Sequence, residues 1–73
     1  MESKIVYTDE NAFKNRVKEF NKLSRGKGPA KGPGYYSSDQ IVTGRDGKQW
    51  KNLSVFFEDN NGEERWVLVW VLA

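Results

Sequence analysis

The chain of 73 residues contains no histidine and no cysteine. Histidine is the most frequent general base and metal ligand, and cysteine supplies soft nucleophiles, disulfides and zinc ligands. Their absence excludes disulfide bonds and a Cys/His zinc site, and no serine has a histidine to activate it. Stability must therefore come from the hydrophobic core and from any partner. We expect no enzyme, no catalytic residue, no metal site and no cofactor.

Long hydrophobic runs are also missing. The longest apolar run, residues 66–72, has seven residues, far fewer than the ~20 that a helix needs to span a bilayer. The chain opens with Met1, Glu2, Ser3 and Lys4, which is unlike the basic start and apolar run of a signal peptide. We therefore expect a cytoplasmic protein without membrane contact.

Proline is scarce, and both prolines lie in one glycine-rich segment. Within residues 25–34 the unit Lys-Gly-Pro occurs twice, and neither a helix nor a strand interior suits this composition. The glycines lack the spacing of a dinucleotide fingerprint and the Gly-Lys-Ser/Thr ending of a P-loop. We predict a flexible basic loop at about residues 24–37 within a single domain of residues 1–73.

One amphipathic helix is predicted before this loop, at residues 10–23. Thr8 or Asp9 supplies the N-cap, and apolar residues recur at spacings of four and three on one face, namely Phe13, Val17 and Phe20. A short β-like run at residues 4–7 precedes the helix.

After residue 35 the hydrophobic period changes to two. Three strands are predicted at residues 40–43, 49–58 and 66–72, with Asp-Gly and Asn-Gly turn signals between them. The predicted fold is α+β: a three-stranded antiparallel β-meander with one helix packed on one face and, at the N-terminus, a short edge strand.

The register of the last hairpin decides which side chains face the helix. If Asn61 and Gly62 are the two central turn residues, the helix-covered face carries Leu53, Val55, Phe57, Trp66, Leu68 and Trp70. The opposite face then carries Phe56, Val67, Val69 and Val71 and has no cover within the chain, so we predict these four as partner-binding residues. A longer turn would slip the register by one residue and exchange the faces of one strand.

Basic residues form the second candidate binding surface. Residues 1–34 carry eight Lys/Arg against four Asp/Glu, whereas residues 35–73 carry four against six. We predict that a row without intervening acids contacts a phosphate backbone or an acidic protein surface, comprising Lys14, Lys18, Lys22, Arg25, Lys27 and Lys31. The alternative is a solvated face that keeps the domain soluble.

Aromatic residues allow two interpretations as well. Trp50, Phe56, Tyr35 and Tyr36 are able to stack on bases, as sheet-surface aromatics do in single-strand binders, or to act as core or interface anchors. Valines cannot stack on bases, so the predicted valine face favours a protein partner or self-association. The carboxylates around the last turn are expected to be solvated rather than catalytic.

In size, composition and economy the chain resembles small bacteriophage-encoded host-takeover proteins, including those that bind host RNA polymerase and redirect transcription. This resemblance implies stoichiometric regulation without catalysis. We therefore expect a non-enzymatic regulator that docks on a larger protein partner, with host RNA polymerase as the partner that the resemblance implies. The alternative is a nucleic-acid-binding domain that grips phosphates through the basic helix face and loop. A homodimer is compatible with either function.

Overall fold

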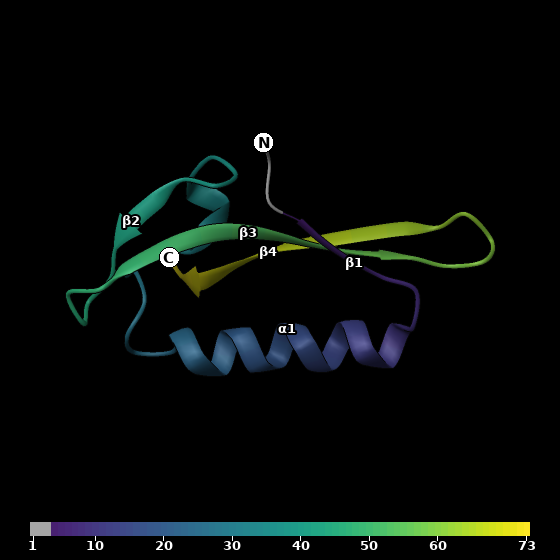
Figure 1. The fold of residues 1–73 in the computed structure, drawn as a ribbon, viewed down its shortest axis with the longest axis horizontal. Helices are drawn as coiled ribbons and strands as arrows, with labels where there is room; N and C mark the ends of the chain where they lie inside the picture. Colours follow the sequence, from purple (N-terminus) through teal and green to yellow (C-terminus); the bar gives the residue numbers. More distant parts are fainter. Residues whose placement is uncertain (1–3) are drawn as a thin grey trace.

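The computed structural model describes residues 4–73 and shows one helix against a mixed four-stranded sheet (Figure 1). The elements in chain order are β1 (Lys4–Tyr7), α1 (Glu10–Ser24), the 3₁₀ turn η1 (Pro33–Tyr35), β2 (Ile41–Thr43), β3 (Gln49–Glu58) and β4 (Glu64–Leu72). This confirms the α+β class and the antiparallel order of β2, β3 and β4. The sheet is mixed rather than purely antiparallel, because β1 runs parallel to β3.

Strand β3 is the centre of the sheet. β4 pairs along one side of it, while β1 and β2 share the other side. The two short strands fit end to end because β2 pairs with residues 49–51 and β1 with residues 54–57. Parallel strands need a crossover connection, and α1 lies within the long connection from β1 to β3. Among residues 4–73, no helix is long and apolar enough to cross a membrane.

The ends of helix α1 are set by Asp9 before its first turn and by a turn around Gly26 after its last. The Asp9 carboxylate accepts a hydrogen bond from the Asn11 amide at 2.9 Å, which satisfies one of the free amides of the first turn. At the other end the amides of Lys27 and Gly28 both donate to the Ser24 carbonyl. Gly26 has a φ of +76° there, a conformation that glycine adopts without a steric penalty.

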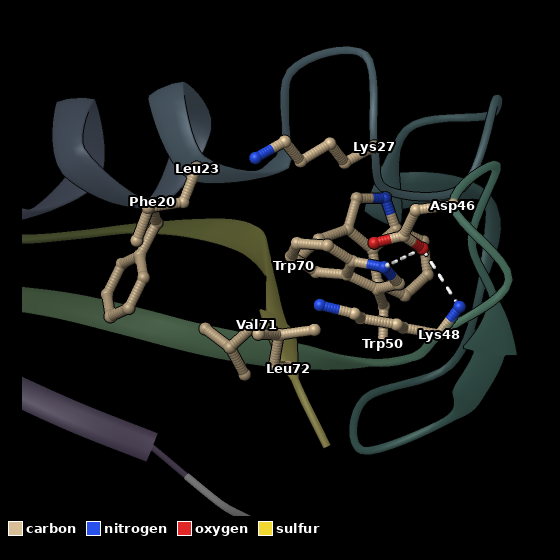
Figure 2. Close-up of a pocket in the computed structure, with 9 residues that line it drawn as sticks. All are labelled: Phe20, Leu23, Lys27, Asp46, Lys48, Trp50, Trp70, Val71 and Leu72. Carbon is tan, nitrogen blue, oxygen red and sulfur yellow. Dashed lines mark hydrogen bonds between the residues drawn. The ribbon is translucent and has the colours of Figure 1, made fainter.

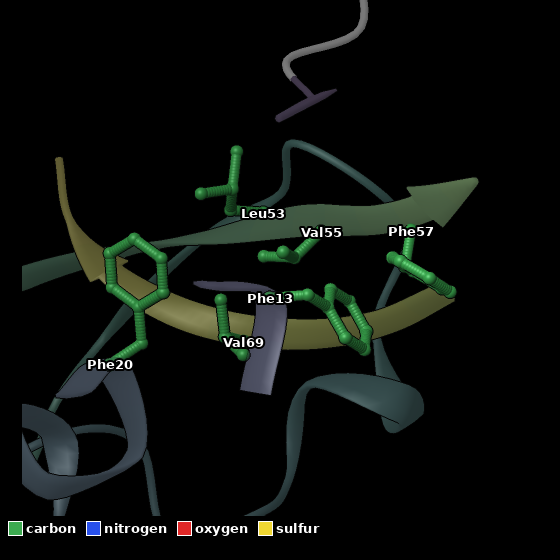
Figure 3. Close-up of a cluster of buried hydrophobic side chains, with 6 residues drawn as sticks. All are labelled: Phe13, Phe20, Leu53, Val55, Phe57 and Val69. Atoms are coloured by element: carbon green, nitrogen blue, oxygen red, sulfur yellow. The ribbon is translucent and has the colours of Figure 1, made fainter. Parts of the chain in front are cut away.

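The main core lies between α1 and one face of the sheet (Figure 3). The helix contributes two buried phenylalanines, and Phe13 contacts Phe57 with ring centroids 5.7 Å apart. The buried cluster consists of Phe13, Phe20, Leu53, Val55, Phe57 and Val69. Each such side chain contributes roughly 1.5–3 kcal/mol by leaving water, so this layer is the main source of stability.

The β3–β4 register differs by one residue from the register predicted with a two-residue turn. Phe57 lies opposite Arg65 and Phe56 opposite Trp66, so the register predicted with Asn61 and Gly62 as the two central turn residues is wrong. The turn is longer because Asp59 pairs with Glu63: the Asp59 amide donates to the Glu63 carbonyl. The Asp59 carboxylate also accepts from the amide of Glu63 at 2.8 Å. These bonds close a three-residue loop, in which Gly62 takes a positive φ.

The one-residue shift exchanges the two faces of β4. Val67, Val69 and Val71 contact the helix-covered core, and Val69 is only 1% exposed. The prediction that these valines form an uncovered face with Phe56 is therefore wrong. The face opposite the helix instead carries Trp66, Leu68, Trp70 and Leu72, which pair with Phe56, Ser54, Asn52 and Trp50.

The predicted basic loop covers one end of this second sheet face, where no cover within the chain was expected. Trp70 donates from Nε1 to the Lys31 carbonyl at 3.2 Å, and its ring meets the edge of Tyr36 at 5.4 Å between centroids. Asn52 is fully buried, and its Nδ2 donates to three loop carbonyls, those of Pro33, Tyr36 and Ser37. In Figure 1 the segment with η1 lies on the side of the sheet opposite α1.

Candidate binding surface

A patch of apolar side chains remains uncovered at the other end of the second sheet face. Val6, Phe56 and Trp66 form one row across β1, β3 and β4, and Leu68 lies next along β4. Val6 is 45% exposed and Trp66 is 60% exposed, while Phe56 and Leu68 are partly exposed. We call these four residues the open patch. Adjacent large apolar groups outside a core are typical of a surface that binds a partner.

Contacts within the open patch hold the aromatic rings in place. The ring centroids of Phe56 and Trp66 lie 6.5 Å apart, within the range of aromatic pairs. The Lys4 ammonium lies 5.5 Å from the centroid of the Phe56 ring, a cation–π distance. The patch thus presents an apolar surface with the Lys4 ammonium at its margin.

Two carboxylates border the open patch on the side of the turn. Glu58 and Glu64 lie directly opposite each other at the ends of β3 and β4 and are both exposed. Neither forms an ion pair with any residue of the chain from Lys4 onward. Like charges directly opposite each other in a sheet are unfavourable, so this end of the patch favours a positively charged group on a partner.

Strand β4 also leaves one hydrogen-bonding edge free beside the patch. At the two ends of the β3–β4 ladder, the Ala73 amide donates to Gln49 and the Asp59 amide to Glu63. In an antiparallel ladder, alternate residues bond to the neighbouring strand and those between them point away. The odd-numbered residues of β4 therefore bond to β3, and the backbone groups of Trp66 and Leu68 point outward. Within residues 4–73, no other strand pairs with this edge.

A small cavity of about 240 Å³ lies at the opposite end of the sheet (Figure 2). Its walls combine apolar side chains with two lysines and an aspartate, namely Phe20, Leu23, Lys27, Asp46, Lys48, Trp50, Trp70, Val71 and Leu72. The Asp46 carboxylate accepts from Trp50 Nε1 at 3.1 Å and from the Lys48 amide at 2.9 Å. The hydrogen bond from Trp50, which has the larger effect, and the hydrogen bond from the Lys48 amide lower the pKa of Asp46. At this volume the cavity is smaller than the roughly 300–1,000 Å³ that is typical of ligand pockets.

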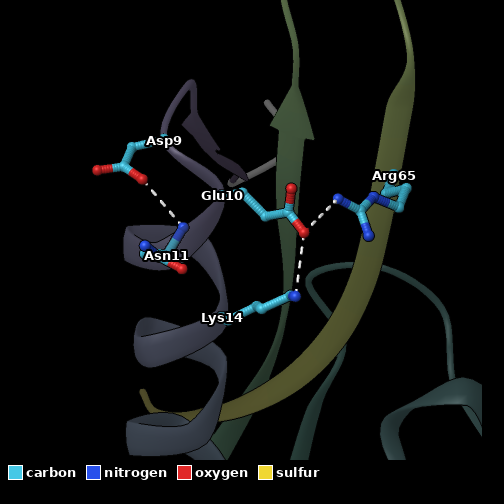
Figure 4. A network of polar contacts seen from close by, with 5 residues as sticks. All are labelled: Asp9, Glu10, Asn11, Lys14 and Arg65. Carbon is cyan, nitrogen blue, oxygen red and sulfur yellow. Dashed lines mark hydrogen bonds and ion pairs between the residues drawn. The ribbon is translucent and has the colours of Figure 1, made fainter.

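The predicted basic row is divided in the structure. Lys14 pairs with Glu10 at 3.0 Å, and Glu10 also pairs with Arg65 at 3.3 Å (Figure 4). Hydrogen bonds and charge from Lys14 and Arg65 lower the pKa of Glu10. The expectation that no acid intervenes is thus wrong at Lys14.

The other basic residues lie on different parts of the surface. Lys18, Lys22 and Arg25 are exposed on or directly after the helix. Lys27 lines the cavity. Lys31 lies on the loop over the second sheet face, where its ammonium is 5.9 Å from the Tyr35 ring centroid. Lys22 and Lys27 line one shallow hollow together with Glu19 and Leu23. Part of the predicted row therefore stays together, with an acid beside it, while Lys14 and Lys31 make their contacts elsewhere.

Of the predicted apolar site, only Phe56 lies on the uncovered surface. Val69 is buried and Val67 and Val71 are half-buried beside the helix core. Sequence reasoning missed Val6, Trp66 and Leu68 because it counted a two-residue turn. The available signal was Asp59, whose side chain caps a longer turn by accepting from backbone amides. From residue 4 onward, no group of three acidic side chains is placed to hold a metal ion.

Comparison of this chain with known protein families, with curated proteins and with solved structures gave no significant match. What the protein does must therefore be inferred from its own surfaces.

Proposed function

We propose that this protein is a non-enzymatic binding module that docks on a larger protein partner through the open patch. The observation that carries the proposal is the exposure of Trp66 beside Val6, Phe56 and Leu68. Trp50 and Trp70, by contrast, are only 3% and 5% exposed. Tryptophan is enriched among the residues that dominate binding energy at protein interfaces, and an aromatic and aliphatic surface of this kind suits such an interface.

The charges around the patch favour a protein over a nucleic acid. Glu58 and Glu64 border the patch with two negative charges, which would repel a phosphate backbone. The strongest case for nucleic acid comes from Lys18, Lys22 and Arg25, which are exposed at the C-terminal end of the helix. They do not lie in the aromatic row of Val6, Phe56 and Trp66, whereas single-strand binders line their stacking aromatics with cations. The row has Lys4 beside Phe56, one cation against the two carboxylates of Glu58 and Glu64.

Bacterial RNA polymerase is the first partner to test, because the chain resembles phage-encoded proteins that act on it. A module of this size would act stoichiometrically, by occupying or altering a surface of the enzyme. Binding of purified RNA polymerase core enzyme to the immobilised protein is the direct assay. Absence of binding would exclude this partner and leave the open patch to be tested with others.

The proposed function is tested by capture from bacterial lysate with and without nuclease treatment, with bound proteins identified by mass spectrometry. The wild type is compared with Trp66→Ala and with Tyr35→Ala, which removes an exposed aromatic outside the patch. We expect specific proteins to be retained by the wild type and Tyr35→Ala and lost from Trp66→Ala, while all three unfold at similar temperatures. Equal capture by all three, or loss of all captured protein after nuclease treatment, would contradict the proposal.

A further inference from the structure

We infer that the segment of the partner that binds is an extended strand, which adds to the free edge of β4 and places a lysine or arginine against Glu58 and Glu64. This inference rests on the proposed function and specifies how the open patch is used. Addition of a strand to an exposed sheet edge is a common mode of peptide recognition, in which the backbone provides affinity and alternate side chains provide specificity.

The backbone of β4 is prepared for such a partner. Hydrogen bonds close the β3–β4 ladder at both ends, from Ala73 to Gln49 and from Asp59 to Glu63. They show that the odd-numbered residues of β4 bond to β3. The amides and carbonyls of Glu64, Trp66 and Leu68 consequently point toward the free edge. A long flat edge is usually blunted, because it otherwise pairs with other chains. Here the edge runs along one side of the open patch. One partner strand would therefore satisfy the backbone groups and place its alternate side chains against Trp66 and Leu68, the two patch residues on β4.

The side chains define a pattern for the bound strand. On the patch side, a residue of the partner would lie beside Glu64, the next such residue beside Trp66 and the third beside Leu68. Read in the direction of β4, the bound strand should carry a basic residue beside Glu64 and apolar residues beside Trp66 and Leu68, at every second position. Antiparallel pairing is slightly the more stable arrangement and would put the basic residue near the C-terminal end of the bound segment. Tyr36 and η1 lie against β4 around Trp70 and mark the other end of the open edge.

A second copy of this chain fits the edge less well. On the patch side, β4 carries only Glu64, Trp66, Leu68, Trp70 and Leu72, so a second β4 offers no cation to the carboxylates in any register.

The test uses a library of random nine-residue peptides, selected for binding to the intact protein. We expect selected peptides to alternate apolar residues with a basic residue at one end. Exchange of that basic residue for glutamate should weaken binding by about tenfold. The double variant Glu58→Lys/Glu64→Lys should reverse this preference. In hydrogen exchange, bound peptide should protect the amides of Trp66 and Leu68, while the odd-numbered amides of β4 are protected with or without peptide.

Two substitutions at one position separate edge pairing from simple docking. Leu68→Pro removes an outward amide, which an edge strand tolerates, whereas Leu68→Ala removes the side chain and keeps the amide. We expect Leu68→Pro to weaken peptide binding by a further tenfold or so beyond Leu68→Ala. Equal binding by these two variants, together with loss of binding in Trp66→Ala, would overturn strand addition and leave the proposed function standing.

The remaining outcomes of the peptide selection also test strand addition to β4. Selection of no peptide, or of peptides without alternation or a basic end, would overturn the inference. Concentration-dependent dimerisation of the wild type, abolished by Leu68→Pro, would show that a second copy occupies the edge and would overturn it as well.

Discussion

The two ends of the second sheet face are built from the same two strands, β3 and β4, yet they differ in what covers them. At one end Trp50, Asn52 and Trp70 are buried beneath the loop before β2 and the turn between β2 and β3. At the other end Phe56 and Trp66 meet the surface. A two-faced apolar sheet needs cover on both sides, and residues 4–73 supply the second cover at one end only.

The covered end shows what is needed to close a sheet face with a loop. The loop has few apolar side chains and is instead held by its backbone: its carbonyls accept hydrogen bonds from Asn52 Nδ2 and Trp70 Nε1. The open end has one comparable donor, Trp66 Nε1, but within residues 4–73 no loop carbonyl accepts a hydrogen bond from it, as the Lys31 carbonyl does from Trp70 Nε1. The covered end is thus closed by hydrogen bonds to the loop, whereas the open end stays exposed to solvent and is the surface proposed above for binding.

The largest effect is expected from aspartate at two adjacent positions of β4. Val69→Asp would bury a carboxylate in the helix core and cost about 5 kcal/mol or more, close to the whole stability expected for a domain of this size. Leu68→Asp places the same group on the partly exposed face and should leave the domain folded. Circular dichroism with thermal unfolding measures both. If Val69→Asp stayed folded while Leu68→Asp unfolded, the register predicted with the two-residue turn would be the correct one.

The second prediction opens the covered end. Asn52→Ala removes the donor to three loop carbonyls, and burying unsatisfied polar groups costs about 1–3 kcal/mol. We expect the free energy of unfolding, measured in urea, to fall by about 3 kcal/mol. Amide hydrogen exchange should become faster for residues 33–37, while the amides of β4 should exchange faster only as far as the lower global stability requires. Asn60→Ala, in the exposed β3–β4 turn, is the matched control and should change neither. Unchanged stability in Asn52→Ala would mean that the loop is held by other contacts.

A smaller effect is expected at a close backbone contact of the covered end. A Cβ at Gly44 would lie 2.4 Å from the Trp50 ring and 2.7 Å from the Lys27 carbonyl oxygen, so Gly44→Ala should destabilise the domain by about 1–3 kcal/mol. A Cβ at Gly32 meets no atom within 4 Å, so Gly32→Ala should be nearly neutral. Thermal unfolding of the two variants decides between them. A harmless Gly44→Ala would show that the Trp50 end is loosely packed.

The smallest effect concerns pH and Asp46, whose pKa is lowered by hydrogen bonds from Trp50 and Lys48. A lowered folded-state pKa stabilises the fold above the ordinary value of 3.8, and this contribution is lost as the pH falls through the lowered value. Asp46→Asn should therefore be less stable than the wild type at pH 6, with the difference shrinking below about pH 4. A difference in unfolding free energy that stays constant with pH would contradict this assignment.

The sequence was sufficient for the elements whose signals are local. The spacing of Phe13, Val17 and Phe20 predicted the helix and its buried face, and the alternation after residue 35 predicted the antiparallel strands. The parallel pairing of β1 was out of reach, because it depends on which part of β3 remains unoccupied after β2 has paired.

The faces of β4 depended on a single turn residue. Glycine at position 62 fits both a two-residue and a three-residue turn, and the side chain of Asp59 selects the longer one. Cover by the glycine-rich loop was equally hard to foresee, since its backbone carbonyls make the contacts. Consequently neither the open patch nor the division of the basic row could be predicted from the sequence.

The most direct measurement of the difference between the two ends is acrylamide quenching of tryptophan fluorescence in the wild type and in Trp66→Phe. Only Trp66 is exposed among the three tryptophans, so the wild type should show one readily quenched component that Trp66→Phe lacks. The two tryptophans left in the variant should resist quenching until the protein unfolds. Equal quenching of both proteins in the folded state would contradict the open patch and, with it, the proposed binding surface.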